Sequence, residues 1–344
     1  MEEKRKKRWG DRRDGTLIRD VDALHLIMPY LYPNKTDNEA FISERIDLTP
    51  INEYIARKNQ ELAEAREAAR RASEGEGQAE APKPQAQGGT EGETAEDNAA
   101  KVPGTDLTVA ELAANEPYKF FYVLLAALVK TVTLRPKMNR FIKGGRMYQR
   151  NDLSLAFVVK KQFNDDAEEA LAFIKFDENT TLNDVRIRLG EEIHACRGDR
   201  GDNSTDQMEL ITKLPNFLLR FAMWILHKLD YYGHVPYDLI KTDPNHASVF
   251  ITNLGSIGLK SGYHHLSNWG TNSIFVIIGE KKMSPFYDEN GNITMKETID
   301  LGLTLDERIA DGYYYSKTVK LLKHLLAHPE LLELPAKEEV DYAK

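Results

Sequence analysis

The feature that most limits how this chain can fold is a long stretch that offers nothing to a hydrophobic core. Residues 72–101 contain no leucine, isoleucine, valine, methionine or aromatic residue, and consist of alanine, glycine, proline and polar or charged residues. Such a segment cannot offset the entropy lost on ordering by burying apolar surface. We therefore predict a disordered insertion over residues 72–104.

The short piece before this insertion decides how many domains the chain forms. It offers one strand, residues 41–48, and a small apolar segment, residues 22–32, which together are too little for a core of their own. The N-terminal piece must therefore pack on the part of the chain that lies after the insertion. We predict a single domain over residues 14–334, with a basic flexible tail at residues 1–13 and a polar tail at residues 335–344.

The overall composition of the 344-residue chain excludes several classes of protein. The net charge is −8, so no excess of positive charge favours nucleic acid as a partner. The longest apolar run, residues 120–129, stops at Lys130, well short of the roughly 20 residues that cross a bilayer. The single cysteine, Cys196, excludes an intrachain disulfide framework and a cysteine-rich zinc module. Because no apolar segment follows the basic N-terminus, we expect no secretory signal and a cytoplasmic protein without membrane partner or metal.

The apolar residues downstream alternate between helical and strand periodicity, which indicates an α/β protein with a mixed sheet. Helices are predicted at residues 50–71, 118–134, 181–195, 215–229 and 313–327, with another beginning near Leu107 behind a Thr105 or Asp106 cap. Strands are predicted at residues 153–160, 171–176, 248–253, 273–281 and 298–306, with a hairpin turn at residues 288–291 and a polar loop at residues 196–206.

The helix at residues 215–229 carries Phe217, Phe221 and Trp224 at helical spacing. Such a stripe fits either a protein core or the surface of a membrane. Because the helix is short and lies between other elements of one fold, we predict that these aromatic side chains are buried in the core.

Three segments near the C-terminal end combine apolar strands with residues that can carry chemistry. The first strand ends in Thr252 and Asn253, and two glycines follow closely. A threonine at a strand end can donate to a developing oxyanion, and glycines let a ligand approach the backbone. The second segment is a buried strand, residues 273–279, and the third, residues 303–312, runs from a strand through a charged turn into a helix.

In this order and spacing, the three segments resemble the catalytic domain of the dihydrolipoamide acyltransferases of 2-oxo-acid dehydrogenase complexes, and the related chloramphenicol acetyltransferase. Residues 46–51 are similar to the family's first strand and helix, residues 135–139 to its Pro-x-x-Asn turn, and residues 328–332 to its C-terminal signature. The resemblance implies an α/β fold like that of chloramphenicol acetyltransferase, a two-layer mixed β-sheet with helices, from about Asp14 onward. Within the family, the chain most resembles a stand-alone form, since the Asp-Lys-Ala motif of a lipoyl domain is absent.

The family's active-site motif is His-x-x-x-Asp-Gly, in which the histidine takes a proton from a thiol and a Ser or Thr hydroxyl stabilises the oxyanion. The resemblance implies that Thr252 supplies this hydroxyl and that Asp311 shapes the loop, but Glu307 stands at the histidine position. The pKa of a thiol is about 8.5 and that of glutamate about 4.3, a mismatch that makes glutamate a poor base for a thiol. We therefore expect weak or altered acyl transfer. Glu307 acts either as a repurposed base or substrate contact, or only as an ion-pairing residue.

A substitute base is available in the loop before the strand at residues 273–281, which contains His264 and His265. These two histidines and Asn253 are candidate substrate-binding residues. The alternative is that the histidines are loop or interface residues with no catalytic role.

The resemblance also implies ligands and partners. The substrate is coenzyme A or an acyl-CoA, no lipoyl group is attached to this chain, and a lipoyl-bearing protein is a possible partner in trans. The chain forms a homotrimer whose active-site channel lies between subunits, with Thr252 of one subunit facing Glu307 and Asp311 of the next. The other hypothesis is a non-catalytic trimeric scaffold, or pseudoenzyme, that binds partner proteins or CoA thioesters.

Overall fold

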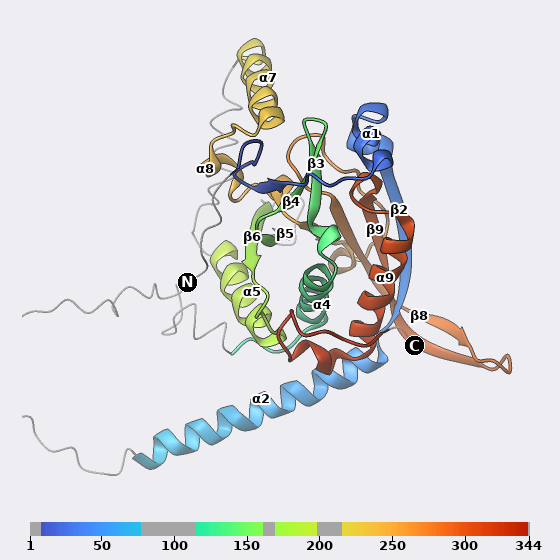
Figure 1. Cartoon of the computed structure of the whole chain (residues 1–344). Helices are drawn as coiled ribbons and strands as arrows, with labels where there is room; N and C mark the ends of the chain where they lie inside the picture. Colours follow the sequence, from blue (N-terminus) through green and yellow to red (C-terminus); the bar gives the residue numbers. More distant parts are fainter. Residues whose placement is uncertain (1–7, 77–114, 161–168, 198–214, 343–344) are drawn as a thin grey trace, which may run out of the picture.

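A six-stranded mixed sheet forms the centre of the computed structural model, which describes residues 8–76, 115–160, 169–197 and 215–342 (Figure 1). The strand order is β2-β9-β8-β7-β5-β6, with β5–β7 and β7–β8 parallel and the other neighbours antiparallel. The strands are β2 Glu39–Asp47, β5 Leu153–Lys160, β6 Glu169–Phe176, β7 Val249–Asn253, β8 Ile274–Tyr287 and β9 Ile293–Asp306. The predicted α/β class with a mixed sheet is confirmed.

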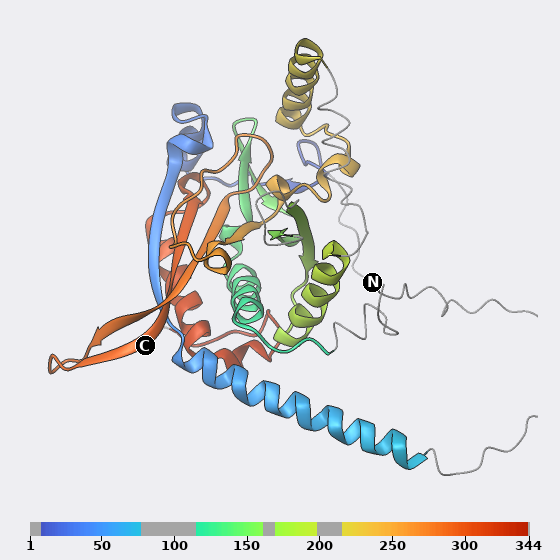
Figure 2. The same ribbon diagram turned by 180° about the vertical axis from the view of Figure 1, so that it is seen from behind.

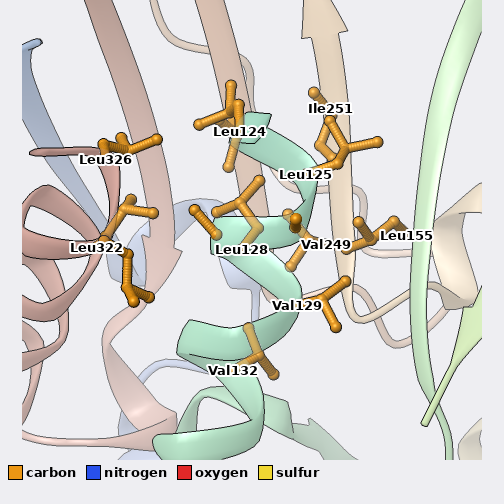
Figure 3. Close-up of a cluster of buried hydrophobic side chains, with 14 of the residues drawn as sticks. Leu124, Leu125, Leu128, Val129, Val132, Leu155, Val249, Ile251, Leu322 and Leu326 are labelled. Carbon is orange, nitrogen blue, oxygen red and sulfur yellow. The ribbon is translucent and has the colours of Figure 1, made fainter. Parts of the chain in front are cut away.

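Three helices cover one face of this sheet: α4 Phe120–Leu134, α5 Leu182–Arg197 and α9 Gly312–Ala327 (Figure 1). In α4 every residue from Tyr122 to Val132 is buried, which explains why almost all of its residues are apolar, Lys130 being the one charged residue among them. The core lies where α4 meets the sheet and α9 (Figure 3), and its side chains include Leu124, Leu128, Val249, Ile251, Leu322 and Leu326.

Helix α2, Thr49–Glu76, runs along one end of the body and extends beyond it (Figures 1 and 2). It begins where β2 ends, as the strand-to-helix signature at residues 46–51 predicts, and it continues into the first residues of the predicted insertion. The rest of the insertion, the helix expected near Leu107 and most of the expected loop at residues 196–206 lie outside the described residues.

A second, three-stranded sheet was not predicted. It has the order β1-β4-β3, from β1 Gly15–Leu17, β3 Arg140–Lys143 and β4 Arg146–Arg150. The β3–β4 turn is the pair Gly144 and Gly145, both with positive φ, the conformation that tight hairpins need and that glycine adopts without strain. Beside this sheet lies helix α1, Ala23–Leu31 (Figure 1).

Residues near both ends of the described chain belong to the folded body, although the sequence predicted tails there. Arg12, expected in a flexible tail, is buried and forms ion pairs with Asp14 and Asp230. At the other end, Ala336 is buried and its amide donates to the carbonyl of Thr180. The buried Lys130 Nζ in turn donates to the carbonyl of Pro335 at 2.8 Å. The expected tails are therefore parts of the folded body over residues 8–13 and 335–342.

Helix α7, Asn216–Tyr232, corrects another prediction. Phe217, Phe221 and Trp224 are 71%, 57% and 58% exposed, so they are not core residues. The helix projects from the body (Figures 1 and 2), and Asp230 near its C-terminal end is the residue of α7 that is fully buried. The helical spacing of the aromatic residues therefore predicts that they share one face of the helix, but it does not predict whether that face is buried. Along the described parts of the chain, no helix combines the length and apolar character needed to cross a bilayer.

Candidate functional site

Thr252 is half-buried at the C-terminal end of β7, in the position that the sequence predicts. Its register partner on β8 is Ile277, whose partner on β9 is Gly302, so the three residues share one face of the sheet. This is the face opposite the helices, and the segment between β7 and β8 crosses it (Figure 2). A Cβ on Gly302 would lie 1.9 Å from the carbonyl oxygen of Gly262. Glycine at 302 thus allows this segment to lie directly on the sheet beside Thr252.

Asn253 has a local structural partner. Its side-chain oxygen accepts the amide of Ser256 at 3.2 Å and caps the short helix η4, Leu254–Ile257. The bond fixes the turn that follows Thr252. Its predicted contact with substrate stays a prediction.

Glu307 is exposed at the first position of the 3-10 turn η5, Glu307–Ile309, directly after β9. Its two neighbours point inward and are buried. Arg308 donates from Nε and Nη2 to both carboxylate oxygens of Asp306, at 2.8 and 2.7 Å, and from Nη1 to the carbonyl oxygen of Tyr32 at 3.0 Å. This bidentate, fully buried pair holds the turn in shape and leaves Glu307 facing solvent.

Asp311 is the N-cap of α9. Its carboxylate accepts the amide of Tyr314 at 2.8 Å, and this backbone bond lowers the pKa of Asp311 below its usual value. A loop-shaping role, as the resemblance implied, agrees with this geometry. This capping geometry does not require Asp311 to contact substrate.

Within one chain, Thr252 and Glu307 lie far apart. They are two strands apart across the sheet, and Glu307 is five positions beyond Gly302, the residue of β9 in register with Thr252. With about 3.4 Å per residue and about 4.8 Å between strands, the two Cα atoms are separated by roughly 19 Å. One copy of the chain therefore does not bring these two residues into one site.

His265 lies at the same end of the sheet as Glu307. Its Nδ1 is 2.7 Å from Oε2 of Glu39, and Glu39 is the register partner of Asp306, which precedes Glu307. The Glu39 side chain is 2% exposed and its other oxygen accepts the amide of Leu266, whereas the His265 ring is 78% exposed. A buried carboxylate thus orients an exposed imidazole. The neighbouring His264 packs its ring against Phe275 at 5.0 Å and shows no such partner among the residues that the structure describes.

A buried cluster of charged residues was missed by the sequence reasoning. Asp230 contacts Arg12 at 3.0 Å and Lys143 at 2.5 Å, with His246 at 3.8 Å. Burial alone would raise the pKa of Asp230, but the neighbouring His246 and Lys143 outweigh it and lower this pKa. The opposite balance raises the pKa of His246, because Asp230 and Asp243 outweigh the effect of burial. Since these residues are scattered along the chain, no local motif could have found the cluster.

The fold, a mixed sheet with helices on one face, is similar to that of solved dihydrolipoamide acetyltransferase structures. Residues 238–334, which include Thr252, Glu307 and Asp311, match the family model "2-oxoacid dehydrogenases acyltransferase (catalytic domain)". The resemblance predicted from the sequence is thereby confirmed, over residues 238–334 by sequence and over most of the chain by fold.

Solved structures give the same fold. A probable dihydrolipoamide acetyltransferase from Listeria monocytogenes 4b F2365 is similar with a TM-score of 0.50 and 11% identity, over 95% of this chain and 99% of that one. The dihydrolipoamide acetyltransferase of Azotobacter vinelandii gives 0.51 and 14%, over 92% and 94%. A chloramphenicol acetyltransferase gives 0.41 and 10%, over 91% and 99%, a score too low to support an argument. Comparison with curated proteins gives no match.

Across residues 8–76, 115–160, 169–197 and 215–342, no group of three or more His, Cys, Asp or Glu side chains is arranged to hold a metal ion.

Proposed function

We propose that this protein transfers an acyl group between a coenzyme A thioester and a thiol or other acceptor. The observation that carries this proposal is the match of residues 238–334 to the acyltransferase catalytic domain, which spans Thr252, Glu307 and Asp311. In the proposed reaction the acceptor thiol loses its proton to a base, and its sulfur attacks the thioester carbonyl. The Thr252 hydroxyl donates to the resulting oxyanion, which then collapses and expels the coenzyme A thiolate.

The proposed site is built by two copies of the chain in a homotrimer. The separation of roughly 19 Å between Thr252 and Glu307 supports this arrangement, because the two cannot act on one substrate within one copy. In the trimer, Thr252 of one subunit faces Glu307 and Asp311 of the next. The acceptor is free in solution or carried on a lipoyl-bearing protein, and the reaction takes place in the cytoplasm.

His265 is the better base in this proposal than Glu307. A carboxylate is mismatched to a thiol by about four pKa units, and an imidazole by only about two. The buried Glu39 binds Nδ1 of His265, which leaves the other nitrogen of an exposed ring to take the proton. Glu307 then contacts the substrate or the facing subunit.

Release of thiol from a panel of acyl-CoA substrates tests the proposal. Thr252→Ala should lower kcat by about 10²- to 10³-fold, as the loss of one oxyanion donor does elsewhere. The matched control is Thr294→Ala, at an exposed strand position on β9, which should leave kcat unchanged. Undetectable activity in the wild type, or equal activity in both variants, would contradict acyl transfer.

The base is tested separately. His265→Gln should lower kcat by about 10²-fold or more and remove the acidic limb of its pH profile, and Glu307→His should raise kcat. If His265→Gln leaves both kcat and the pH profile unchanged, His265 is not the base.

The second candidate is a non-catalytic trimeric scaffold, and the carboxylate at the family's histidine position favours it. Calorimetry with coenzyme A and sedimentation separate the two functions. A trimer that binds no coenzyme A and shows no turnover, even as Glu307→His, would be a scaffold.

A further inference from the structure

A cavity of about 440 Å³ opens between α1, the β3–β4 hairpin and α7. Neither Thr252, Glu307 nor Asp311 lines it. The hairpin turn that borders it is fixed by close packing, since a Cβ on Gly144 would lie 2.6 Å from the carbonyl oxygen of Tyr231. The volume of the cavity is in the range of cavities that hold small molecules.

Two lysines share one backbone oxygen in the wall of this cavity. Lys35 Nζ donates to the carbonyls of Gly270 and Asn272 at 3.1 and 2.9 Å, and Lys143 Nζ donates to the same Gly270 oxygen at 3.2 Å. Two ammonium groups on one oxygen repel each other, and burial makes the repulsion stronger than it would be in water. Both lysines line the cavity, as does the buried Arg308.

The positive charge of Lys35 is not paired directly with a carboxylate, although the charge of Asp306 acts on it. Lys143 has Asp230 and Arg308 has Asp306, but among the described residues Lys35 forms no ion pair, although it is 3% exposed. Burial, and then the charge of Lys143, lower the pKa of Lys35 to about 7. An apolar side chain would fill this position at lower cost to the fold. A lysine here is therefore better explained by an anion that enters the cavity and offsets the charge.

The rim of the cavity has a different character. Tyr30, Trp224 and Tyr231 line it and are 67%, 58% and 50% exposed. Exposed aromatic rings beside a cationic floor offer flat apolar surface to a planar group. Lys228, also exposed on α7, adds a further positive charge at the edge.

We propose that this cavity binds a small molecule that joins a phosphate group to a planar ring. The phosphate lies against Lys35, which uses two of its three N–H groups on the Gly270 and Asn272 carbonyls, and Lys228 adds positive charge at the rim. The ring lies against Trp224 and Tyr30. The lining of this cavity does not include Thr252, His265, Glu307 or Asp311, and the proposal does not depend on acyl transfer.

Calorimetry on the full chain with adenosine 5′-monophosphate, adenosine and inorganic phosphate as probes tests this proposal. We expect the monophosphate to bind at least tenfold more tightly than adenosine, which lacks the anion, and than phosphate, which lacks the ring. Lys228→Met, at an exposed position that leaves the fold intact, should weaken binding of the monophosphate severalfold. Lys35→Met should weaken it about tenfold or more, as expected for loss of a charged hydrogen bond. The control is Lys320→Met, on the exposed side of α9, which should not change binding.

Three results would overturn the proposal. One is that none of the three probes binds the wild-type protein. Another is that adenosine or phosphate binds as tightly as the monophosphate. The last is that Lys320→Met weakens binding as much as Lys228→Met, because the effect would then be one of overall charge.

Discussion

The buried pair between Asp306 and Arg308 offers the sharpest test of how the turn carrying Glu307 is held. Both side chains are at most 2% exposed and meet through two charged hydrogen bonds. Removal of one partner leaves an uncompensated charge in the interior, which costs about 3–5 kcal/mol in other proteins. We therefore expect Asp306→Asn and Arg308→Met each to lower the free energy of unfolding by about 3 kcal/mol or more.

The double variant should lower the free energy of unfolding by much less than the sum of the two single variants, because it leaves neither charge unpaired in the interior. A coupling of about 2 kcal/mol between the substitutions is expected, within the range for residues in direct contact. Urea denaturation at fixed protein concentration measures all four proteins, and fixing the concentration removes effects of self-association.

The surface pair between Lys323 and Glu44, at 2.7 Å, is the matched control. Lys323→Met should cost less than about 1 kcal/mol, because exposed ion pairs contribute little. The reasoning fails if the Asp306 and Arg308 variants are additive within about 0.5 kcal/mol, or cost no more than the control.

Three further predictions concern single positions. Lys35 titrates near pH 7 when folded and near 10.5 when unfolded, so its cost to stability is complete below pH 7 and is relieved as pH rises toward 10.5. The stability of the wild type relative to Lys35→Met, from urea denaturation at pH 7 and 9.5, should therefore increase with pH, and equal differences would refute this. Asp311→Ala should cost about 1 kcal/mol at pH 7 through loss of the helix cap, and this cost should shrink only as the pH falls through the lowered pKa of Asp311, because the carboxylate that accepts the Tyr314 amide is then protonated. Gly302→Ala should lower the thermal midpoint strongly because its Cβ would overlap the Gly262 oxygen, whereas Gly262→Ala, with open space around it, should be tolerated.

The sheet and the helices that cover it were predictable from the sequence where strands and helices are buried. The strand at residues 153–160 was predicted with its observed ends, and so was the C-terminal end of β9. The hairpin that extends β8 to Tyr287 and starts β9 at Ile293 was predicted too short. Its arm projects from the body and its side chains are largely exposed, so burial imposes no apolar pattern on it (Figure 1).

The parts that the sequence did not predict depend on contacts between distant segments. The sequence around Arg12 predicts only a basic tail, because the partner of Arg12, Asp230, is far away in the sequence. The exposure of Phe217 depends on what lies next to α7, which periodicity does not report. Thr252 was a candidate from its place at a strand end, and the resemblance to the acyltransferase family implied roles for both Thr252 and Glu307, but the separation of the two residues follows from strand register and needed the structure.

The position of β2 at one edge of the sheet affects how a newly made chain can fold. β2 pairs with β9, and the ion-paired residues Arg45 and Asp300 on these strands are 255 positions apart in sequence. During synthesis β2 therefore lacks its pairing partner, with its backbone groups unpaired, until β9 has also left the ribosome. Contacts of such long range form slowly, and an unpaired strand can meanwhile pair with other molecules. Folding of this protein is thus completed late, by the joining of its first long strand to its last.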